Sequence, residues 1–408
     1  MPHLTDLARE ILRNAEIIDG AASRPQDAIT LVDVDEARTA LLDATHKLTL
    51  HAQSPESYMF QQMWSITDTF ILRMIYTLNL PHHVPLTGST TYAAIATQVC
   101  VPEDHLTRLF RYAITIGFFA EPTASHVAHS PPSRLLALNP DAFDAMGMIL
   151  HELGPATHAF PSALSRFAAS PEPHETAYNI ANKTDLGMYD FLAQHPSRAR
   201  RFAGAMRFFS DDAVSYIRAL LSAFPWTDAA QDREDFIVVD VGGGVGSVAV
   251  TLAEHTAHMR FVVQDKEEPV EEGRGVLPRG LEGRVEFQTH DFFTPQPRAA
   301  DVYFFRWIFH NWSDKYCVRI LQNLIPALKS GARVMVYEHV MEPGVDMLLS
   351  KKRERYLDLF MLCAYNGHER TEEEWRALFA AADGRFAFQG VTTTLGAPPS
   401  LIQTVWRG

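Results

Sequence analysis

Apolar residues recur at helical spacing through the first half of the chain. In residues 4–18, leucine, isoleucine and alanine return every three or four positions with charged residues between them, as in an amphipathic helix. Residues 102–117 repeat the pattern and add Pro102 in the first turn and Gly117 at the end, which are helix start and stop signals. The chain up to about residue 230 is therefore predicted to be mostly helical.

Residues 89–138 place such helices in a particular order. A helix begins at a Ser/Thr cap, a second helix follows, and then come a short hairpin and a third helix. This is the order of a winged-helix fold, which often reads DNA. Acidic residues nearby offset Arg108 and Arg111 on the helix that would enter the groove. Packing or dimerisation is therefore the favoured interpretation.

The pattern changes after residue 235, where short β-branched and aromatic runs alternate with segments of helical length. This alternation predicts an α/β fold with a mostly parallel, doubly wound sheet, and the last two runs are close enough to form an antiparallel edge pair. Residues 225–235 are polar and lack apolar periodicity, which places the domain boundary there. We expect a helical domain over 1–230 and a sheet domain over 231–408. The seven candidate strands are 235–241, 260–265, 284–293, 300–309, 332–341, 385–395 and 400–406.

Composition narrows the class of partner and the compartment. The 408 residues carry a net charge of -13 without long runs of one sign, which gives no support for binding nucleic acid or an anionic membrane. The most apolar segment, residues 63–80, is interrupted by Asp68 and Arg73, so no membrane span is predicted. The three cysteines are scattered without metal-ligand or disulfide spacing. They favour the cytoplasm and no metal site.

The sequence VVDVGGGVGS, residues 238–247, ends the first predicted strand. In a doubly wound sheet, ligands bind beyond the carboxyl ends of the strands. Dinucleotide-binding folds use Gly-x-Gly-x-x-Gly here, and a carboxylate would repel their pyrophosphate but attract a cation. S-adenosylmethionine (SAM) carries an ammonium and a sulfonium and no phosphate, so SAM is the predicted cofactor. The residues of the Asp-x-Gly-x-Gly-x-Gly motif are Asp240, Gly242, Gly244 and Gly246.

Further candidate cofactor residues follow the next strands. Asp265 ends the second strand, where a carboxylate could hydrogen-bond ribose hydroxyls, although a turn or helix-cap role is the alternative. Asp291 lies at the end of the third strand and is placed for the adenine amino group, unless it is a solvated strand-end acid. Phe292 and Arg306, at the ends of the third and fourth strands, complete this set with Trp312.

The loop after the fourth strand contains a candidate base, His310, at the same edge of the sheet. An imidazole is the side chain best suited to accept a hydroxyl proton near neutral pH, and a carboxylate would orient it. Glu338 ends the fifth strand, and Glu369 lies just before a helix whose capping box uses Glu374. An ordinary strand-end or surface acid is the alternative for each of these two glutamates.

The order of these motifs resembles the plant caffeate-type and fungal small-molecule O-methyltransferases. The matching stretches run from DVGGGVG through VVQD, HDFF and DVYFFRWIFHNWSD to NGHERTEEEW, and the likeness covers about residues 60–408. It implies a winged-helix dimerisation domain ahead of a Rossmann-like domain, a homodimer, and a reaction without metal. It also implies that His310 is the base, that Glu338 and Glu369 flank it, and that Trp312 lies beside adenine.

The chain is more similar to the fungal branch, and Asn311 stands where plant members have aspartate. Some fungal proteins of this fold, of the leporin pericyclase type, keep SAM but catalyse dehydration or pericyclic ring closure. In those, a histidine matching His129 and a basic residue matching His290, just before Asp291, activate a substrate carbonyl. The stretch HDFF is also ordinary for fungal methyltransferases, so it leaves both activities open.

The sequence therefore predicts a SAM-dependent O-methyltransferase that acts on a phenolic or enolic secondary metabolite. The alternatives are a SAM-bound pericyclase or dehydratase acting on a polyketide or pyridone alkaloid intermediate, and a catalytically silent SAM-binding dimer. For the methionines among the candidate pocket residues, core packing is the more common role. The candidate pocket residues are Met206, Phe209, Met361, Tyr365 and Asn366.

Overall fold

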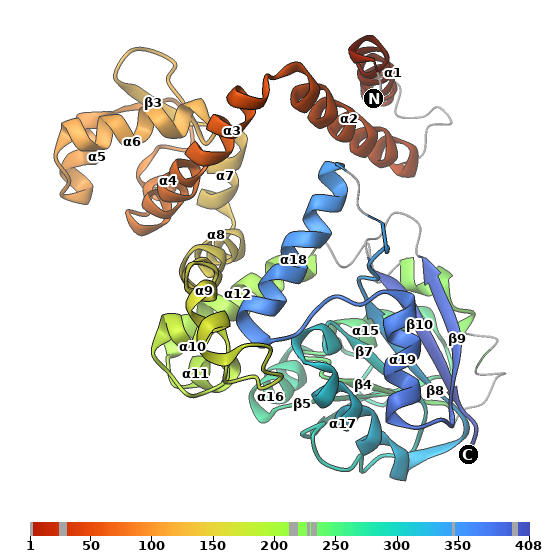
Figure 1. The fold of residues 1–408 in the computed structure, drawn as a ribbon. Coiled ribbons are helices and arrows are strands. Elements are labelled where there is room, and N and C mark those ends of the chain that lie inside the picture. The colour runs from red at the N-terminus through yellow and green to blue at the C-terminus, as the bar shows by residue number, and fades with distance from the viewer. Residues whose placement is uncertain are drawn as a thin grey trace. The chain divides into compact units, whose positions relative to one another are not determined.

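A computed structural model shows two compact units whose segments alternate along the chain (Figure 1). The sheet unit comprises residues 1–47, 164–176 and 213–408, and the helical unit comprises residues 48–163 and 177–212. The boundary predicted between residues 230 and 231 lies outside the described residues. The structure describes residues 3–23, 31–211, 219–226, 229, 235–344, 347–393 and 399–408.

The sheet unit is built on a seven-stranded sheet in the order β6-β5-β4-β7-β8-β10-β9. Strands β6, β5, β4, β7 and β8 pair in parallel, and β10 pairs antiparallel with both β8 and β9. The predicted parallel sheet with an antiparallel edge pair is therefore confirmed. The strands are β4 (Ile237–Val241), β5 (Arg260–Asp265), β6 (Val285–Thr289), β7 (Ala300–Arg306), β8 (Leu328–Glu338), β9 (Phe386–Thr393) and β10 (Ser400–Trp406).

Helices cover both faces of this sheet, because successive strand residues point to opposite sides. Val238 belongs to the apolar cluster that includes residues of α15 and α16, and Val239 belongs to the cluster that includes residues of α17 and α19. Burial on both faces explains why the central strands β4 and β7 are mostly apolar. The helical segments are α1 (Leu4–Ser23), α2 (Leu31–Ala52), α15 (Ser247–His255), α16 (Glu267–Val276), η3 (Phe309–Asn311), α17 (Asp314–Leu324), η4 (Ile325–Ala327), α18 (Leu349–Tyr365) and α19 (Glu372–Ala382).

The helical unit contains the predicted winged-helix arrangement. The side chain of Thr91 accepts a hydrogen bond from the Ala94 N–H at 3.2 Å, so the predicted Ser/Thr cap is confirmed. A three-stranded sheet in the order β1-β3-β2 forms the wing. The elements of this part are β1 (Thr90–Thr91), α5 (Tyr92–Val99), α6 (Glu103–Thr115), β2 (Phe119–Ala120), β3 (His126–His129) and α7 (Pro131–Leu138).

Helices flank the wing on both sides in the sequence. A π-helical turn, η2 (Ile149–Leu153), joins α8 to α9. Its Glu152 is fully buried and forms ion pairs with Arg198 and Arg201 of α12, so the carboxylate is compensated within the unit. The remaining elements are α3 (Pro55–Trp64), α4 (Ile66–Thr77), η1 (Leu80–His83), α8 (Pro140–Met148), α9 (Gly154–Phe167), α10 (Ala177–Asn182), α11 (Met188–Ala193) and α12 (Pro196–Asp211).

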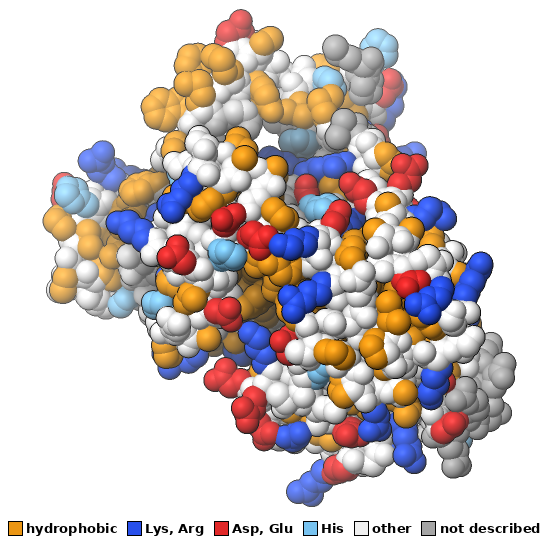
Figure 2. Space-filling model, turned by 60° about the horizontal axis from the view of Figure 1, so that its bottom comes forward, with side chains coloured by type: hydrophobic (Ala, Val, Ile, Leu, Met, Phe, Trp, Pro, Cys, Tyr) orange, Lys and Arg blue, Asp and Glu red, His pale blue; other side chains and the backbone are white. Residues whose placement is uncertain are grey.

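The surface carries charges of both signs. On the face shown in Figure 2, basic and acidic side chains are interspersed, with apolar side chains grouped between them. Within the described part of the chain, no helix combines the length and the apolar character that crossing a bilayer requires. The cytoplasmic location expected from the cysteines stays a prediction.

Candidate active site

The glycine loop after β4, residues 242–246, exposes backbone without side chains at the carboxyl end of the sheet. Gly242, Gly244 and Gly246 have φ angles of 72°, 58° and 84°, in the left-handed region that favours glycine. A Cβ atom at Gly242 would also collide with the Ile308 side chain. The loop leads directly into α15 at Ser247. The backbone at these positions therefore favours glycine, and at Gly242 it leaves no room for a side chain.

Two charged side chains at the ends of β4 and β7 have buried atoms without a hydrogen-bond partner among the described residues. Among the described residues, no partner contacts Oδ2 of Asp240 or Nε and Nη2 of Arg306. The Arg306 guanidinium lies over the Trp307 ring, 4.1 Å from its centroid. Burial raises the pKa of Asp240 to about 7, against the opposing charge of Arg306. An unsatisfied acid and an unsatisfied guanidinium fit a ligand with both an ammonium and a carboxylate, as in the methionine part of SAM.

Asp265, the last residue of β5, braces the glycine loop. Its Oδ2 accepts a hydrogen bond from the Gly244 N–H at 2.8 Å, and its Oδ1 accepts one from the Lys266 N–H at 2.7 Å. Burial raises the pKa of Asp265, and these two backbone hydrogen bonds oppose the rise. The predicted contact with ribose hydroxyls stays a prediction.

Aromatic side chains gather after β6 and around the start of α17. The Phe293 and Trp312 rings meet edge to face with centroids 4.7 Å apart, and Phe292 lies 6.1 Å from Trp312. Tyr316 stands 5.7 Å from the same indole. Asp291 is exposed, and its Oδ1 accepts a hydrogen bond from the Phe293 N–H. The cluster could receive a flat heteroaromatic ring. The sequence analysis missed Phe293 and Tyr316, although Phe293 is the second phenylalanine of HDFF.

His310 and Glu369 form a buried pair. The short turn η3 carries His310, and its Nδ1 lies 2.7 Å from Oε1 of Glu369. Because a carboxylate faces Nδ1, a neutral ring carries its hydrogen there and leaves the lone pair on Nε2. No described residue hydrogen-bonds that Nε2. The arrangement therefore presents an unengaged basic nitrogen held by an anionic partner.

Each member of this pair shifts the pKa of the other toward the charged form. Burial lowers the pKa of His310, but the charge of Glu369 and its hydrogen bond outweigh burial, and the pKa is raised overall. Burial raises the pKa of Glu369, but His310 outweighs it, and the pKa is lowered. His310 is thus a stronger base than an ordinary histidine.

Glu338, the last residue of β8, is almost fully buried, at 1% exposure. Its Oε1 accepts hydrogen bonds from the Ile308 N–H at 2.8 Å and the Phe309 N–H at 2.7 Å. Burial raises the pKa of Glu338 to about 7, against the charge of His310. The family resemblance implies that both glutamates flank the imidazole; of the two, Glu369 hydrogen-bonds the ring and Glu338 hydrogen-bonds the backbone of the turn.

The segment between α9 and α10 packs on this part of the sheet unit, which the sequence analysis did not expect. Ser313 occupies the N-cap position of α17, but its hydroxyl donates to the Pro171 carbonyl instead of accepting from the helix. The side-chain amide of Asn366 donates to the carbonyls of Glu172 and Glu175, at 2.8 and 3.0 Å. The amide hydrogens of Asn366 are therefore already engaged within the sheet unit.

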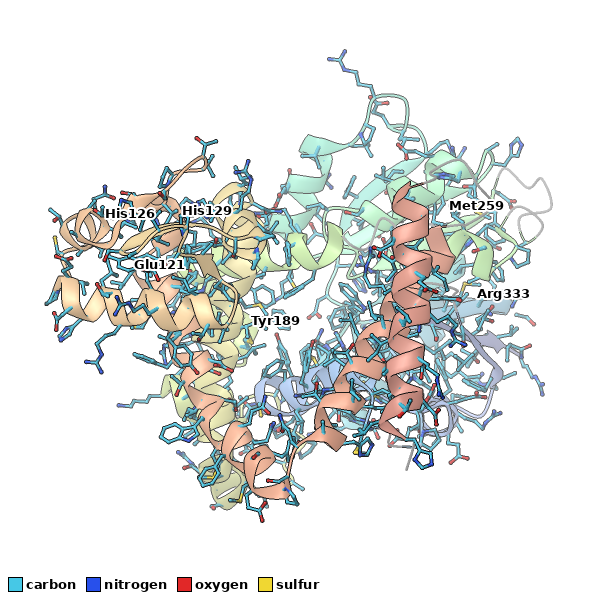
Figure 3. The ribbon with its side chains drawn as sticks, turned by 90° about the horizontal axis from the view of Figure 1, so that it is seen from above. Glu121, His126, His129, Tyr189, Met259 and Arg333 are labelled. Carbon is cyan, nitrogen blue, oxygen red and sulfur yellow. The ribbon has the colours of Figure 1, made fainter. Side chains whose placement is uncertain are left out.

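The two histidines of the pericyclase alternative lie in different units. In the wing strand β3, Nδ1 of His129 lies 3.0 Å from the Ser133 hydroxyl, and Nε2 lies 3.1 Å from the Val84 carbonyl oxygen; Figure 3 labels His129. His290 follows β6 in the sheet unit, and burial lowers its pKa. Both ring nitrogens of His129 thus have partners in the helical unit.

The candidate pocket residues also come from both units. Met206 and Phe209 belong to α12 of the helical unit, whereas Met361 and Tyr365 are buried on α18 of the sheet unit. The pocket built from them stays a prediction. In the described part of the chain, no cluster of three or more histidine, cysteine or acidic residues could hold a metal ion.

Comparisons with known proteins show which family the chain resembles. The family model for the O-methyltransferase domain matches residues 189–385. O-methyltransferase AMT9 of Alternaria alternata is 37% identical over 99% of this chain and 98% of that protein. Chlorophenol O-methyltransferase of Trichoderma longibrachiatum is 33% identical over 95% of this chain and 84% of that protein.

A solved structure has the same fold along almost the whole chain. LepI in complex with SAM matches with a TM-score of 0.77 and 21% identity, over 98% of this chain and 100% of that one. At this identity the likeness concerns the fold, so it does not distinguish one reaction from another.

Proposed function

The chain belongs to the SAM-dependent O-methyltransferases, and we propose that it methylates a phenolic or enolic hydroxyl with His310 as the general base. One observation carries the proposal: Nδ1 of His310 is held by Glu369 at 2.7 Å, while Nε2 has no hydrogen-bond partner among the described residues. This is the arrangement that a base for a hydroxyl proton needs. A relative that carries chlorophenol in its name supports a phenolic substrate.

In this mechanism, Nε2 of His310 accepts the substrate hydroxyl proton as the oxygen attacks. Glu369 keeps the ring oriented and stabilises the imidazolium that forms. Glu338 fixes the backbone that carries the ring, through the Ile308 and Phe309 N–H groups. When bound, SAM would supply the methyl group from its sulfonium. The sulfur would keep the electron pair of the broken bond and become the neutral thioether of S-adenosylhomocysteine.

The cofactor would be held at the carboxyl ends of β4, β5 and β7. Asp240 suits the ammonium group of SAM, and Arg306 suits its carboxylate. Asp265, next to the glycine loop, would face the ribose hydroxyls. The rings of Phe292 and Trp312 would pack against the adenine, with Asp291 near its amino group. The unpartnered atoms of Asp240 and Arg306 support this placement.

Methyl transfer is favoured over the pericyclase alternative. In that alternative, His129 would bond a substrate carbonyl, but both of its ring nitrogens have protein partners at 3.0 and 3.1 Å. Burial also lowers the pKa of His129, which disfavours the protonated form needed to polarise a carbonyl. A silent SAM-binding protein would have no use for a buried histidine–glutamate pair with an open nitrogen.

We also propose that the protein is a homodimer through α3 and α4. Helix α3 has no buried residue, and Met63 and Trp64 are 59% and 67% exposed. Apolar patches of this kind on single chains usually mark interfaces, and a second copy would cover them. Light scattering at micromolar concentration should give twice the mass of one chain, and Trp64→Glu should lower it. A wild-type mass of one chain would contradict the dimer.

The base is tested with His310→Ala. We expect turnover of a phenol to fall roughly 100-fold, a usual scale for a positioned base, while calorimetry shows nearly unchanged SAM affinity. His255→Ala, on the exposed end of α15, is the control and should keep wild-type turnover. Wild-type turnover in His310→Ala would overturn the proposed base.

A further inference from the structure

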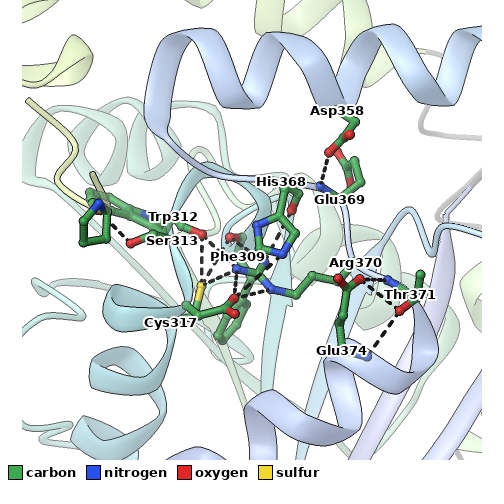
Figure 4. A network of polar contacts seen from close by, with 12 residues as sticks. Phe309, Trp312, Ser313, Cys317, Asp358, His368, Glu369, Arg370, Thr371 and Glu374 are labelled. Atoms are coloured by element: carbon green, nitrogen blue, oxygen red, sulfur yellow. Dashed lines mark hydrogen bonds and ion pairs between the residues drawn. The ribbon is translucent and has the colours of Figure 1, made fainter. Parts of the chain in front are cut away.

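Arg370 lies directly after Glu369 and is 1% exposed. It has no direct role in the proposed methyl transfer. We infer that Arg370 is a positioning residue: its guanidinium fixes the turn that carries His310, so that the ring meets both Glu369 and the substrate hydroxyl. The inference rests on the proposed base. Figure 4 shows the guanidinium at the centre of a network of polar contacts that joins the turn, α17 and the loop before α19.

The guanidinium binds the turn at both of its ends. Nη1 donates to the Phe309 carbonyl at 3.1 Å, and Nη2 donates to the Trp312 carbonyl at 2.9 Å. These carbonyls belong to the residues on either side of His310 and Asn311. A planar group with several fixed donors can hold two such acceptors at a set separation, which a lysine ammonium cannot do.

Two other groups complete the support of the turn. The thiol of Cys317 lies 3.3 Å from the same two carbonyl oxygens, of Phe309 and Trp312, and 3.3 Å from Nη2 of Arg370. On the other side, Glu338 accepts from the Ile308 and Phe309 N–H groups. The turn is therefore held through its carbonyls by Arg370 and through its amides by Glu338.

The loop that carries Arg370 and Glu369 is itself pressed against the turn. A Cβ atom at Gly367 would collide with the His310 carbonyl oxygen and with the Trp312 nitrogen. The Glu369 N–H donates to Asp358 at 2.9 Å, which fixes the loop on α18. Two neighbouring residues of this loop, Glu369 and Arg370, thus contact the imidazole and the backbone of the turn, so the chain sets the distance between the two contacts.

A neutral residue of similar length can replace Arg370 without leaving a buried carboxylate that has lost its ion-pair partner. The ion-pair partner of Arg370 is Asp314, whose side chain is 64% exposed and can be hydrated. Glu338 keeps its two backbone donors. Arg370→Met is therefore expected to fold, and Arg370→Lys keeps the charge as well.

The charge of Arg370 should affect the pH dependence of activity, which a purely structural role would leave unchanged. Arg370 opposes the raised pKa of His310, so without it His310 should keep its proton to higher pH. Activity needs a neutral ring and falls as the ring becomes protonated. The acidic limb of the pH–activity profile should therefore move to higher pH. The groups that act on His310 are Glu338, Glu369 and Arg370; Asp314 and Cys317 act on Arg370, and His339 acts on Glu369.

The test measures kcat per cofactor-binding site, counted by calorimetry with S-adenosylhomocysteine, across pH with the phenol that the wild type methylates fastest. For Arg370→Met we expect kcat to fall roughly 10- to 100-fold, as for a small misplacement of a base, with KM for the phenol within about twofold. The acidic limb of the pH profile should move to higher pH. Arg370→Lys should lower kcat less and leave the limb in place.

Arg284→Met is the matched control. Arg284 donates to the carbonyls of Ala253, Thr256 and Met259, at the opposite end of the strands. Its loss should lower Tm but leave kcat per site and the acidic limb unchanged.

Wild-type kcat per site together with an unchanged acidic limb of the pH profile in Arg370→Met would overturn the inference. If that variant does not fold, wild-type kcat in Arg370→Lys would overturn it. Failure of the base proposal is seen separately, as full activity of His310→Ala.

Discussion

Replacing Glu369 with glutamine tests how much the anionic partner of His310 contributes. The variant keeps the shape of the side chain but loses its charge. The contact is 2.7 Å long, and the side chains of His310 and Glu369 are 9% and 0% exposed, so solvent screens the interaction little. A hydrogen bond to a charged group contributes about 1.5–3 kcal/mol, and each 1.4 kcal/mol corresponds to about tenfold in rate. We therefore expect kcat to fall roughly 10- to 100-fold.

The pH profile of the Glu369→Gln variant should change in a defined direction. Glu369 raises the pKa of His310, and the base works only when neutral, so activity is lost as pH falls through that pKa. Without the carboxylate the pKa drops, and the acidic limb should move to lower pH. This shift is opposite in sign to the one expected for Arg370→Met.

The assay is initial-rate methylation of a phenol from about pH 5 to pH 9, with Glu373→Gln as the control. Glu373 is exposed in the first turn of α19, so its replacement should leave both the rate and the limb unchanged. If Glu369→Gln kept wild-type kcat and an unmoved limb, Glu369 would have no part in holding the base.

Two further predictions concern the cofactor. Asp265→Ala should weaken SAM binding by roughly 1–3 kcal/mol in calorimetry, the scale of a lost buried hydrogen-bonded group; equal affinities would remove Asp265 from the site. Because the pKa of Asp240 is raised to about 7, its carboxyl group should protonate as pH falls from about 8 to about 6, and SAM affinity should fall with it. Asp240→Asn should bind SAM weakly with no such pH dependence, whereas an unaltered pH dependence would contradict the assignment.

The sheet could be predicted because its strands are buried on both faces. Runs such as 237–241 and 300–306 are mostly apolar and are separated by helix-length segments, which leaves few arrangements other than a parallel sheet. The position of Asp240 and the glycines then follows, since strand ends fix where a ligand binds. His310 was located in the same way, as the histidine after a predicted strand end.

Roles that depend on contacts between distant segments could not be predicted. Glu338 looked like an orienting acid at a strand end, but its carboxylate bonds the backbone of a turn 29 and 30 positions earlier in the chain. Apart from the His368 carbonyl, the partners of Arg370 lie on the turn and on α17, so its local sequence does not show them. Ser313 has the sequence of a capping residue, yet Pro171, 142 positions away, takes its hydroxyl.

We propose that this chain transfers a methyl group to the hydroxyl group of a small molecule. The most direct measurement is mass spectrometry of the wild type incubated with SAM and a panel of phenols and pyridones, with S-adenosylhomocysteine counted in the same sample. We predict a product heavier by one methyl group, one S-adenosylhomocysteine per product, and loss of both in His310→Ala but not in His129→Ala. A product of unchanged mass, formed by His310→Ala but not by His129→Ala, would contradict the account.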